Sequence, residues 1–262
     1  MIEYYQDFTV ARDGIEYCAA PLPYRWLDVP NCYDLSKTHG MAQYLWFEIA
    51  DFQARDIANS INELTIHARN FDAWQKILQG LERDEAFRVH HEFIRSNSIV
   101  ALNLPYSIKS RFYYAISHLS HQANRVLHAE NWQESHLPLD RDINQEIAAK
   151  ISKGWKGWRK VASRLDRCDT GTFREGTLNF RNSYTHRHDV IIGLEATPPI
   201  KREATSTPNK TSYIVGGTKI MELSIISQLI KVEFDNFSRA YSAFQNLINE
   251  QKDALSTLEQ PM

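Results

Sequence analysis

Three residues in the second half of the 262-residue chain have the types and spacing needed for acid–base chemistry beside a phosphate. Arg181 and Asn182 are adjacent, and His186 follows four residues after Asn182. A histidine titrates near pH 6.5, so His186 can accept or donate a proton at neutral pH. An arginine keeps its charge and can hold a phosphate through two parallel hydrogen bonds, which suits Arg181 for stabilising negative charge. Asn182 is placed to orient His186.

A short helix over about 173–188 is expected to position these residues. Apolar or small side chains recur at one-turn spacing along it, at Phe173, Thr177, Phe180 and Tyr184. At about 100° per residue, Asn182 and His186 share one face of a regular helix, whereas Arg181 and His186 differ by roughly 140°. Arg181 must therefore reach around the helix, or the helix must unwind near His186.

The segment from Phe180 to His188 resembles the R-x4-H signature of HEPN domains, a group of all-helical proteins. The residue after the arginine in that signature is commonly Asn, Asp or His, and Asn182 occupies that position. Preceding helices and a long following helix match the family's bundle, so the resemblance covers residues 109–255. It implies a homodimer in which two motif helices form one composite site that cuts RNA without a metal or another cofactor.

The resemblance also implies roles for individual residues. His186 would take a proton from a ribose 2′-hydroxyl or give one to the leaving oxygen, and Arg181 would stabilise charge on the scissile phosphate. Possible accessory residues are His188, Tyr184 and Arg187, although the spacing of Tyr184 is more typical of a core residue. Some HEPN toxins carry a modified tyrosine two residues after the histidine. Here the position is His188, so that form of control is not expected.

The biological role also follows from the resemblance alone. It implies a toxin, phage-defence or stress-response protein that damages RNA, with an antitoxin or another regulatory protein as a possible partner. The residues themselves do not indicate which RNA is cut.

A local group of basic residues is the best candidate for an RNA-binding surface. The whole chain has a net charge of -2, so a global positive field is excluded. Residues 151–187, however, contain nine Lys or Arg and three Asp or Glu. The predicted RNA-binding residues are Lys153, Lys156, Arg159, Lys160 and Arg164. Trp155 and Trp158 lie among them and could stack on bases, but a core position is more typical of tryptophan in a helix.

Composition indicates a globular protein of the cytoplasm. With 43% hydrophobic and 24% charged residues, the chain can bury a sizeable core. Its three cysteines are widely spaced, which indicates neither disulfides nor a zinc site. No signal peptide and no apolar run of membrane-spanning length is apparent. Walker, Gly-x-Gly-x-x-Gly and Gly-x-Ser-x-Gly motifs are absent, so the common nucleotide-cofactor and hydrolase classes are not expected.

Hydrophobic periodicity predicts an all-α bundle of five to six main helices over residues 41–262, after an irregular N-terminal arm over residues 1–40. The resemblance implies that this bundle is HEPN-like. Helices are expected from Met41 to about Ala68, from about Asp84 to a stop at Pro105, and from Ser110 to His128. Another spans 141–166, with a kink or break at Gly154 and Gly157. The last helix covers 218–254, after a flap over 190–217 whose apolar runs, Val190–Leu194 and Tyr213–Val215, suggest a hairpin.

Other interpretations of the same residues stay open. Arg181 and His186 could be an incidental basic pair at a solvated helix end. The bundle could instead bind a nucleotide or a partner protein without catalysis, or pair its last helix with another chain. A polar stripe consists of His118, His121, Arg125 and His128; it could line the same cleft or bind a metal, although a solvated face is more typical.

Overall fold

The structure, a computed structural model, describes residues 2–28, 40–186, 192–193, 201–204, 211–214 and 221–257. The all-α class is confirmed, with nine α-helices in these ranges. The helices are α1 (Ile2–Asp13), α3 (Gly40–Leu78), α4 (Arg83–Val89), the π-helix η1 (His90–Ile94), α5 (Arg95–Leu127), the short 3₁₀ turns η2 (Glu134–His136) and η3 (Asp140–Asp142), α6 (Gln145–Ile151), α7 (Lys156–Leu165), α8 (Gly171–Gly176), α9 (Phe180–His186) and α10 (Leu223–Ser256). The strands are β1 (Lys201–Ala204) and β2 (Thr211–Ile214).

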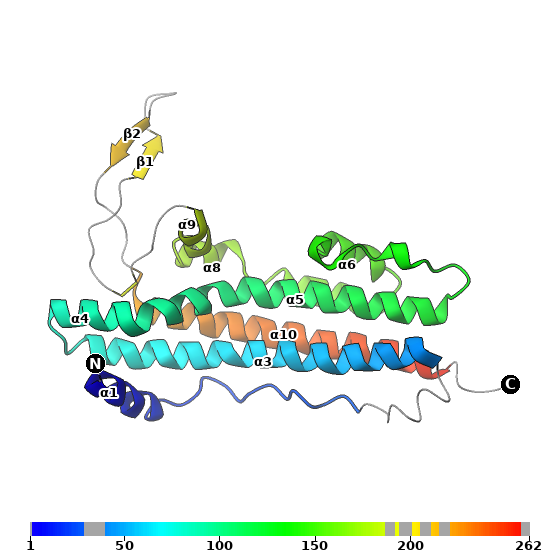
Figure 1. The fold of residues 1–262 in the computed structure, drawn as a ribbon, viewed down its shortest axis with the longest axis horizontal. Coiled ribbons are helices and arrows are strands. Elements are labelled where there is room, and N and C mark those ends of the chain that lie inside the picture. Colours follow the sequence, from blue (N-terminus) through cyan, green and yellow to red (C-terminus); the bar gives the residue numbers. More distant parts are fainter. Residues whose placement is uncertain are drawn as a thin grey trace. The chain divides into compact units, whose positions relative to one another are not determined.

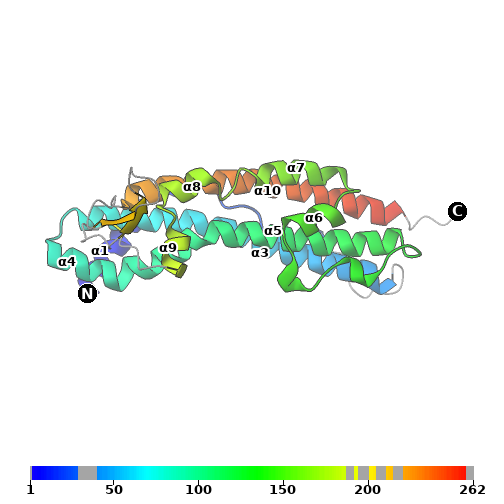
Figure 2. The ribbon, with the colours of Figure 1, turned by 90° about the horizontal axis from the view of Figure 1, so that it is seen from above.

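The chain divides into two compact units, and each draws on three separate stretches of sequence. Unit 1 comprises Met1–Cys18, Thr65–Asn103 and Gly171–Lys231, and unit 2 comprises Ala19–Leu64, Leu104–Thr170 and Val232–Met262. Within each unit, parts of α3, α5 and α10 lie side by side (Figures 1 and 2). The arrangement within a unit is therefore set by contacts between residues far apart in sequence.

The expectation of an irregular N-terminal arm is wrong for Ile2–Asp13, which form α1. Only Phe8 of this helix is buried, so α1 has no apolar stripe that a periodicity search could find. The Phe8 ring stacks on Trp74 of α3 with centroids 4.3 Å apart, and Trp74 stacks in turn on Phe93 of η1 at 5.2 Å. Tertiary packing in unit 1, rather than local periodicity, thus holds α1 in place.

The helix expected to stop at Pro105 does not stop there. Pro105 lies inside α5, which runs to Leu127 and joins the second and third expected helices into one. An interior proline costs roughly 3 kcal/mol because it removes a backbone hydrogen bond. Buried apolar residues on either side, Leu102 and Ile108, continue the packed face of the helix. Their burial offsets that cost, at about 1.5–3 kcal/mol for each large apolar side chain.

The other expected helices are confirmed with shifted boundaries. The first begins at Gly40 but continues to Leu78, ten residues past the expected end, because Phe71 and Trp74 extend its buried face. The expected break near Gly154 is confirmed, since α6 ends at Ile151 and α7 begins at Lys156. The long last helix is α10.

A hairpin is present within the expected flap. β1 and β2 pair antiparallel, with Lys201 opposite Ile214. The expected first strand, Val190–Leu194, is not the one that pairs in the hairpin. From that run Ile192 instead forms a parallel bridge with Met221, and Val190, Ile191 and Leu194 lie outside the described residues.

Unit 2 has an aromatic core crossed by a chain of polar contacts. The Phe112 ring of α5 packs edge-on against Phe244 of α10, with centroids 5.5 Å apart. Next to it, the buried amide of Gln251 accepts a hydrogen bond from the Trp46 indole at 3.1 Å and donates to the Ser120 hydroxyl at 3.0 Å. Ser120 in turn shares a hydrogen bond with Ser152 at 2.8 Å. Because each buried polar group has a partner, the chain fixes α3, α5, α10 and the end of α6 in register.

Candidate active site

The residues of the candidate site lie on α9, which belongs to unit 1. The prediction of a single helix over 173–188 is wrong. Two helices occupy this segment, because α8 ends at Gly176 and α9 begins only at Phe180. Between them Leu178 and Asn179 have φ angles of 51° and 53°. Two consecutive residues in the left-handed region reverse the chain, so the helix breaks although the apolar spacing continues.

Phe180 anchors α9, since its ring is only 2% exposed. Tyr184, one turn later, stacks on Phe180 with centroids 5.5 Å apart and ring planes 6° from parallel. Tyr184 is itself 37% exposed. On this side of α9, Phe180 and Ser183 are buried and Tyr184 is exposed. The neighbouring Arg181 and Asn182 are therefore held at the edge of the unit.

The motif residues differ in their surroundings. Arg181 is exposed and Asn182 is half-buried. The backbone positions of Asn182 and His186 are four residues apart on a regular helix, so they share a face about 40° wide. His186 is the last residue of α9, and its side chain lies outside what the structure describes, as do Arg187 and His188. Because Arg181 is exposed, its side chain can reach a ligand in solvent.

The predicted RNA-binding residues lie on α7 and the turn before it, in unit 2. Lys153, Lys156, Arg159 and Lys160 are exposed and Arg164 is half-buried. The opposite face of the helix packs into the core through Trp158, Val161 and Leu165. In the described parts of the chain, none of the five basic residues forms an ion pair. Their charges are therefore available to an anionic ligand.

The two tryptophans of this region are core residues, not stacking platforms. Trp155 and Trp158 are each 8% exposed. The Trp155 indole donates to the side-chain oxygen of Asn124 at 3.1 Å. The core interpretation of both rings is confirmed, and base stacking by them would require α7 to leave the unit.

α7 is fixed to α10 at its first turn. Both carboxylate oxygens of Glu250 accept backbone hydrogen bonds, from Lys156 at 2.9 Å and from Gly157 at 2.7 Å. A negative charge at a helix N-terminus is favourable because the free amide groups there carry partial positive charge. A Cβ atom on Gly157 would lie 3.1 Å from the Leu247 Cα, so a larger residue would require the two helices to shift apart by a few tenths of an ångström.

Sequence reasoning did not identify a buried carboxyl group beside the turn before α8. Glu233 of α10 is 2% exposed and accepts a hydrogen bond from the backbone N–H of Asp169 at 2.9 Å. Burial raises the pKa of Glu233 to about 7, although the Asp169 hydrogen bond and the Lys109 ammonium oppose the rise. Lys109 donates to the carbonyl of Cys168 in the same turn at 2.9 Å. No signal in the sequence distinguishes Glu233 from solvent-facing acids of α10.

The polar stripe on α5 is solvated only in its second half. His121 is completely buried, and the His118 side chain is 19% exposed and contacts Asp140 at 3.2 Å. Arg125 and His128 are exposed. Within the described ranges, no group of three or more His, Cys, Asp or Glu side chains could hold a metal ion.

No protein-family model, curated protein or solved structure matches this chain. Of the helices in the described ranges, none combines the length and the apolar character that crossing a lipid bilayer requires.

Proposed function

We propose that the protein is a metal-independent RNA endonuclease of the HEPN type, with Arg181, Asn182 and His186 as its catalytic residues. The observation that supports this most is the exposed position of Arg181 on a short helix beside Asn182 and His186. A solvated face of a core-anchored helix offers the access that a long polyanion needs. The all-α architecture agrees with the resemblance.

In the proposed reaction, a histidine removes the proton of a ribose 2′-hydroxyl while the 2′-oxygen attacks the adjacent phosphorus. The bond from phosphorus to the 5′-oxygen of the next nucleotide breaks, and that oxygen receives a proton. The products are a 2′,3′-cyclic phosphate and a 5′-hydroxyl end, so atoms and charges balance without an external oxidant or metal. Arg181 stabilises the negative charge that builds on the phosphate.

The proposed reaction needs a general base for the 2′-hydroxyl and a general acid for the leaving oxygen. One copy of the motif, however, supplies only one central histidine, His186. A homodimer resolves this, because two copies of His186 in one composite cleft can divide the roles. His188, Tyr184 and Arg187 are accessory candidates in the same cleft. Lys153, Lys156, Arg159, Lys160 and Arg164 would bind the RNA backbone. An antitoxin or another regulatory protein, and a role in toxicity or phage defence in the cytoplasm, complete the proposal.

The deciding experiment incubates total RNA with wild-type protein, Arg181→Ala and His186→Ala in the presence of EDTA. Each substitution should reduce cleavage by at least about 100-fold, because it removes charge stabilisation or proton transfer. Circular dichroism and dimer size should not change, since the buried Phe180 anchors α9.

Matched controls are Arg83→Ala and His91→Ala, which remove exposed side chains of the same types from unit 1. Both should cut at the wild-type rate. Wild-type cleavage should weaken steeply between about 50 and about 200 mM salt, because phosphate contacts release counterions. Normal cleavage by His186→Ala would refute the site, and cleavage lost in EDTA would refute the metal-independent mechanism. No cleavage by the wild type would favour a non-catalytic binding bundle.

A further inference from the structure

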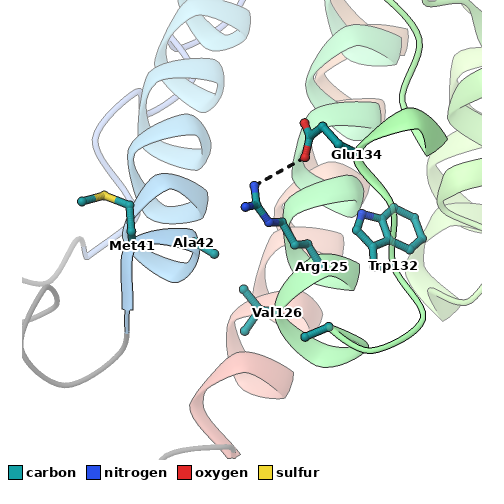
Figure 3. A pocket seen from close by; sticks show the side chains of 7 residues that line it. Met41, Ala42, Arg125, Val126, Trp132 and Glu134 are labelled. Atoms are coloured by element: carbon teal, nitrogen blue, oxygen red, sulfur yellow. Dashed lines mark hydrogen bonds and ion pairs between the residues drawn. The ribbon is translucent and has the colours of Figure 1, made fainter.

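A second candidate site lies in unit 2, where the end of α5 and the loop after it meet the start of α3 (Figure 3). It is a pocket of about 430 Å³. Its apolar lining consists of Met41, Ala42, Val126 and Ala129, and its polar lining consists of Arg125, Trp132 and Glu134. All of these residues belong to unit 2, so the pocket does not depend on the α9 motif or on the ribonuclease proposal.

The indole nitrogen of Trp132, which lines the pocket, is buried and has no hydrogen-bond partner among the described residues. His121 is 0% exposed, lies outside the lining and contacts Glu134 through Nε2. The two rings are in contact, with centroids 5.2 Å apart. In Figure 3 the nitrogen edge of Trp132 is turned towards α5, the helix that carries His121. Because this nitrogen is buried, a ligand in the pocket meets other atoms of the Trp132 ring.

Arg125 and Glu134 place opposite charges at the mouth of the same pocket. Their closest atoms, Nη1 and Oε2, are 3.5 Å apart, and the two side chains are 49% and 73% exposed. Glu134 Oε1 also lies 3.4 Å from Nε2 of His121. Burial lowers the pKa of His121, although Glu134 opposes this, so its ring is neutral at neutral pH. Such long, exposed contacts contribute little by themselves, and both charged groups keep most of their hydrogen-bonding capacity.

The lining thus presents one cation, one anion, an indole ring and an apolar wall. A ligand with only a carboxylate would be repelled by Glu134, and one with only an ammonium group would be repelled by Arg125. A zwitterion carries both groups on one carbon atom and matches both charges. Its net charge of zero also leaves no uncompensated charge in the pocket.

We propose that this pocket binds a free α-amino acid with an apolar side chain. The carboxylate accepts hydrogen bonds from the Arg125 guanidinium, and the ammonium group donates to Glu134. The apolar side chain packs against Ala42, Val126 and the neighbouring wall. The ligand therefore joins α3, α5 and the loop between α5 and α6.

The test is a titration of the full-length, ¹⁵N-labelled protein with L-leucine, followed by NMR. The readout is the indole N–H signal of Trp132, which is assigned by its loss in Trp132→Phe. Two probes of nearly the same shape are 4-methylpentanoate, which lacks the ammonium group, and 3-methylbutylamine, which lacks the carboxylate. The variants are Arg125→Gln and Glu134→Gln, with Arg141→Gln as the matched control because Arg141 is 80% exposed in the same unit.

Leucine should shift the Trp132 signal saturably, with a dissociation constant of about 1 mM or tighter. Each single-ended probe, and each variant at Arg125 or Glu134, should bind at least about tenfold more weakly, since a charged hydrogen bond is lost. Arg141→Gln should bind leucine normally. Equal binding of 4-methylpentanoate and leucine would overturn the proposal, and so would the absence of any saturable shift with leucine. Circular dichroism of the variants checks that folding is retained.

Discussion

At the residue scale, side chains of the same type differ in exposure and in charged neighbours, and these differences decide what each can bind. His121 and His91 are both histidines on helices, yet one is completely buried and the other is exposed. Arg181 and Arg125 are both exposed, and Arg125 lies 3.5 Å from the carboxylate of Glu134. The exposed Arg181 therefore fits the binding of a polyanion, whereas Arg125 fits a ligand that carries both charges.

Glu233 provides a prediction at this scale. Its pKa is raised to about 7 by burial, from an ordinary value of 4.5, so the native state binds this proton more tightly than the unfolded chain. The resulting stabilisation is fully present below pH 4.5 and is lost as the pH rises through 7. Between about pH 5 and about pH 8, the wild type should lose about 3 kcal/mol of unfolding free energy relative to Glu233→Gln.

Urea unfolding of both proteins across this pH range measures the difference. The glutamine variant is a suitable reference, because its side-chain oxygen can still accept the hydrogen bond from Asp169. Parallel pH profiles for the two proteins would show that Glu233 does not change its protonation state in this range.

At the element scale, the attachment of α7 to α10 depends on one close approach. A Cβ atom at position 157 would lie 3.0 Å from Glu250 Oε2 and 3.1 Å from the Leu247 Cα. Gly157→Ala should therefore lower the unfolding free energy by about 1–3 kcal/mol, because the backbone of α10 cannot move aside cheaply. The same change at Gly154, where the added Cβ would meet no atom of a non-adjacent residue within 4 Å, is the matched control.

Gly154→Ala should leave stability unchanged or raise it by up to about 1 kcal/mol, since alanine restricts the unfolded chain. Urea denaturation of the two variants and the wild type gives the comparison. Equal stabilities of Gly157→Ala and Gly154→Ala would contradict the packing of α7 against α10 described above.

At the scale of the whole molecule, both units depend on the last helix. Ile226 and Ile230 of α10 are buried in unit 1, and Phe237 and Phe244 are buried in unit 2. A fragment of residues 1–170 lacks one of the three stretches of each unit. It should therefore unfold without a cooperative transition in urea, while the full chain gives a sigmoidal curve followed by circular dichroism. A sigmoidal transition of the fragment would contradict this dependence.

Much of the fold follows from local sequence patterns. Repeated apolar residues at one-turn spacing predict the helices beginning near Met41 and ending near His128, and the long last helix. Gly154 predicts the break between α6 and α7. These features are local, because a helix forms or breaks through neighbours three or four residues away.

The sequence by itself thus determined the all-α class, the main helices and the spacing of Arg181, Asn182 and His186. Only the tertiary structure decided that a helix passes through Pro105, that Phe8 stacks on Trp74, and that α8 and α9 are separate. It also decided that His121 is buried against Trp132, a residue that lines a pocket. Each of these depends on burial against residues far away in the chain, and a periodicity of three or four residues carries no information about such partners.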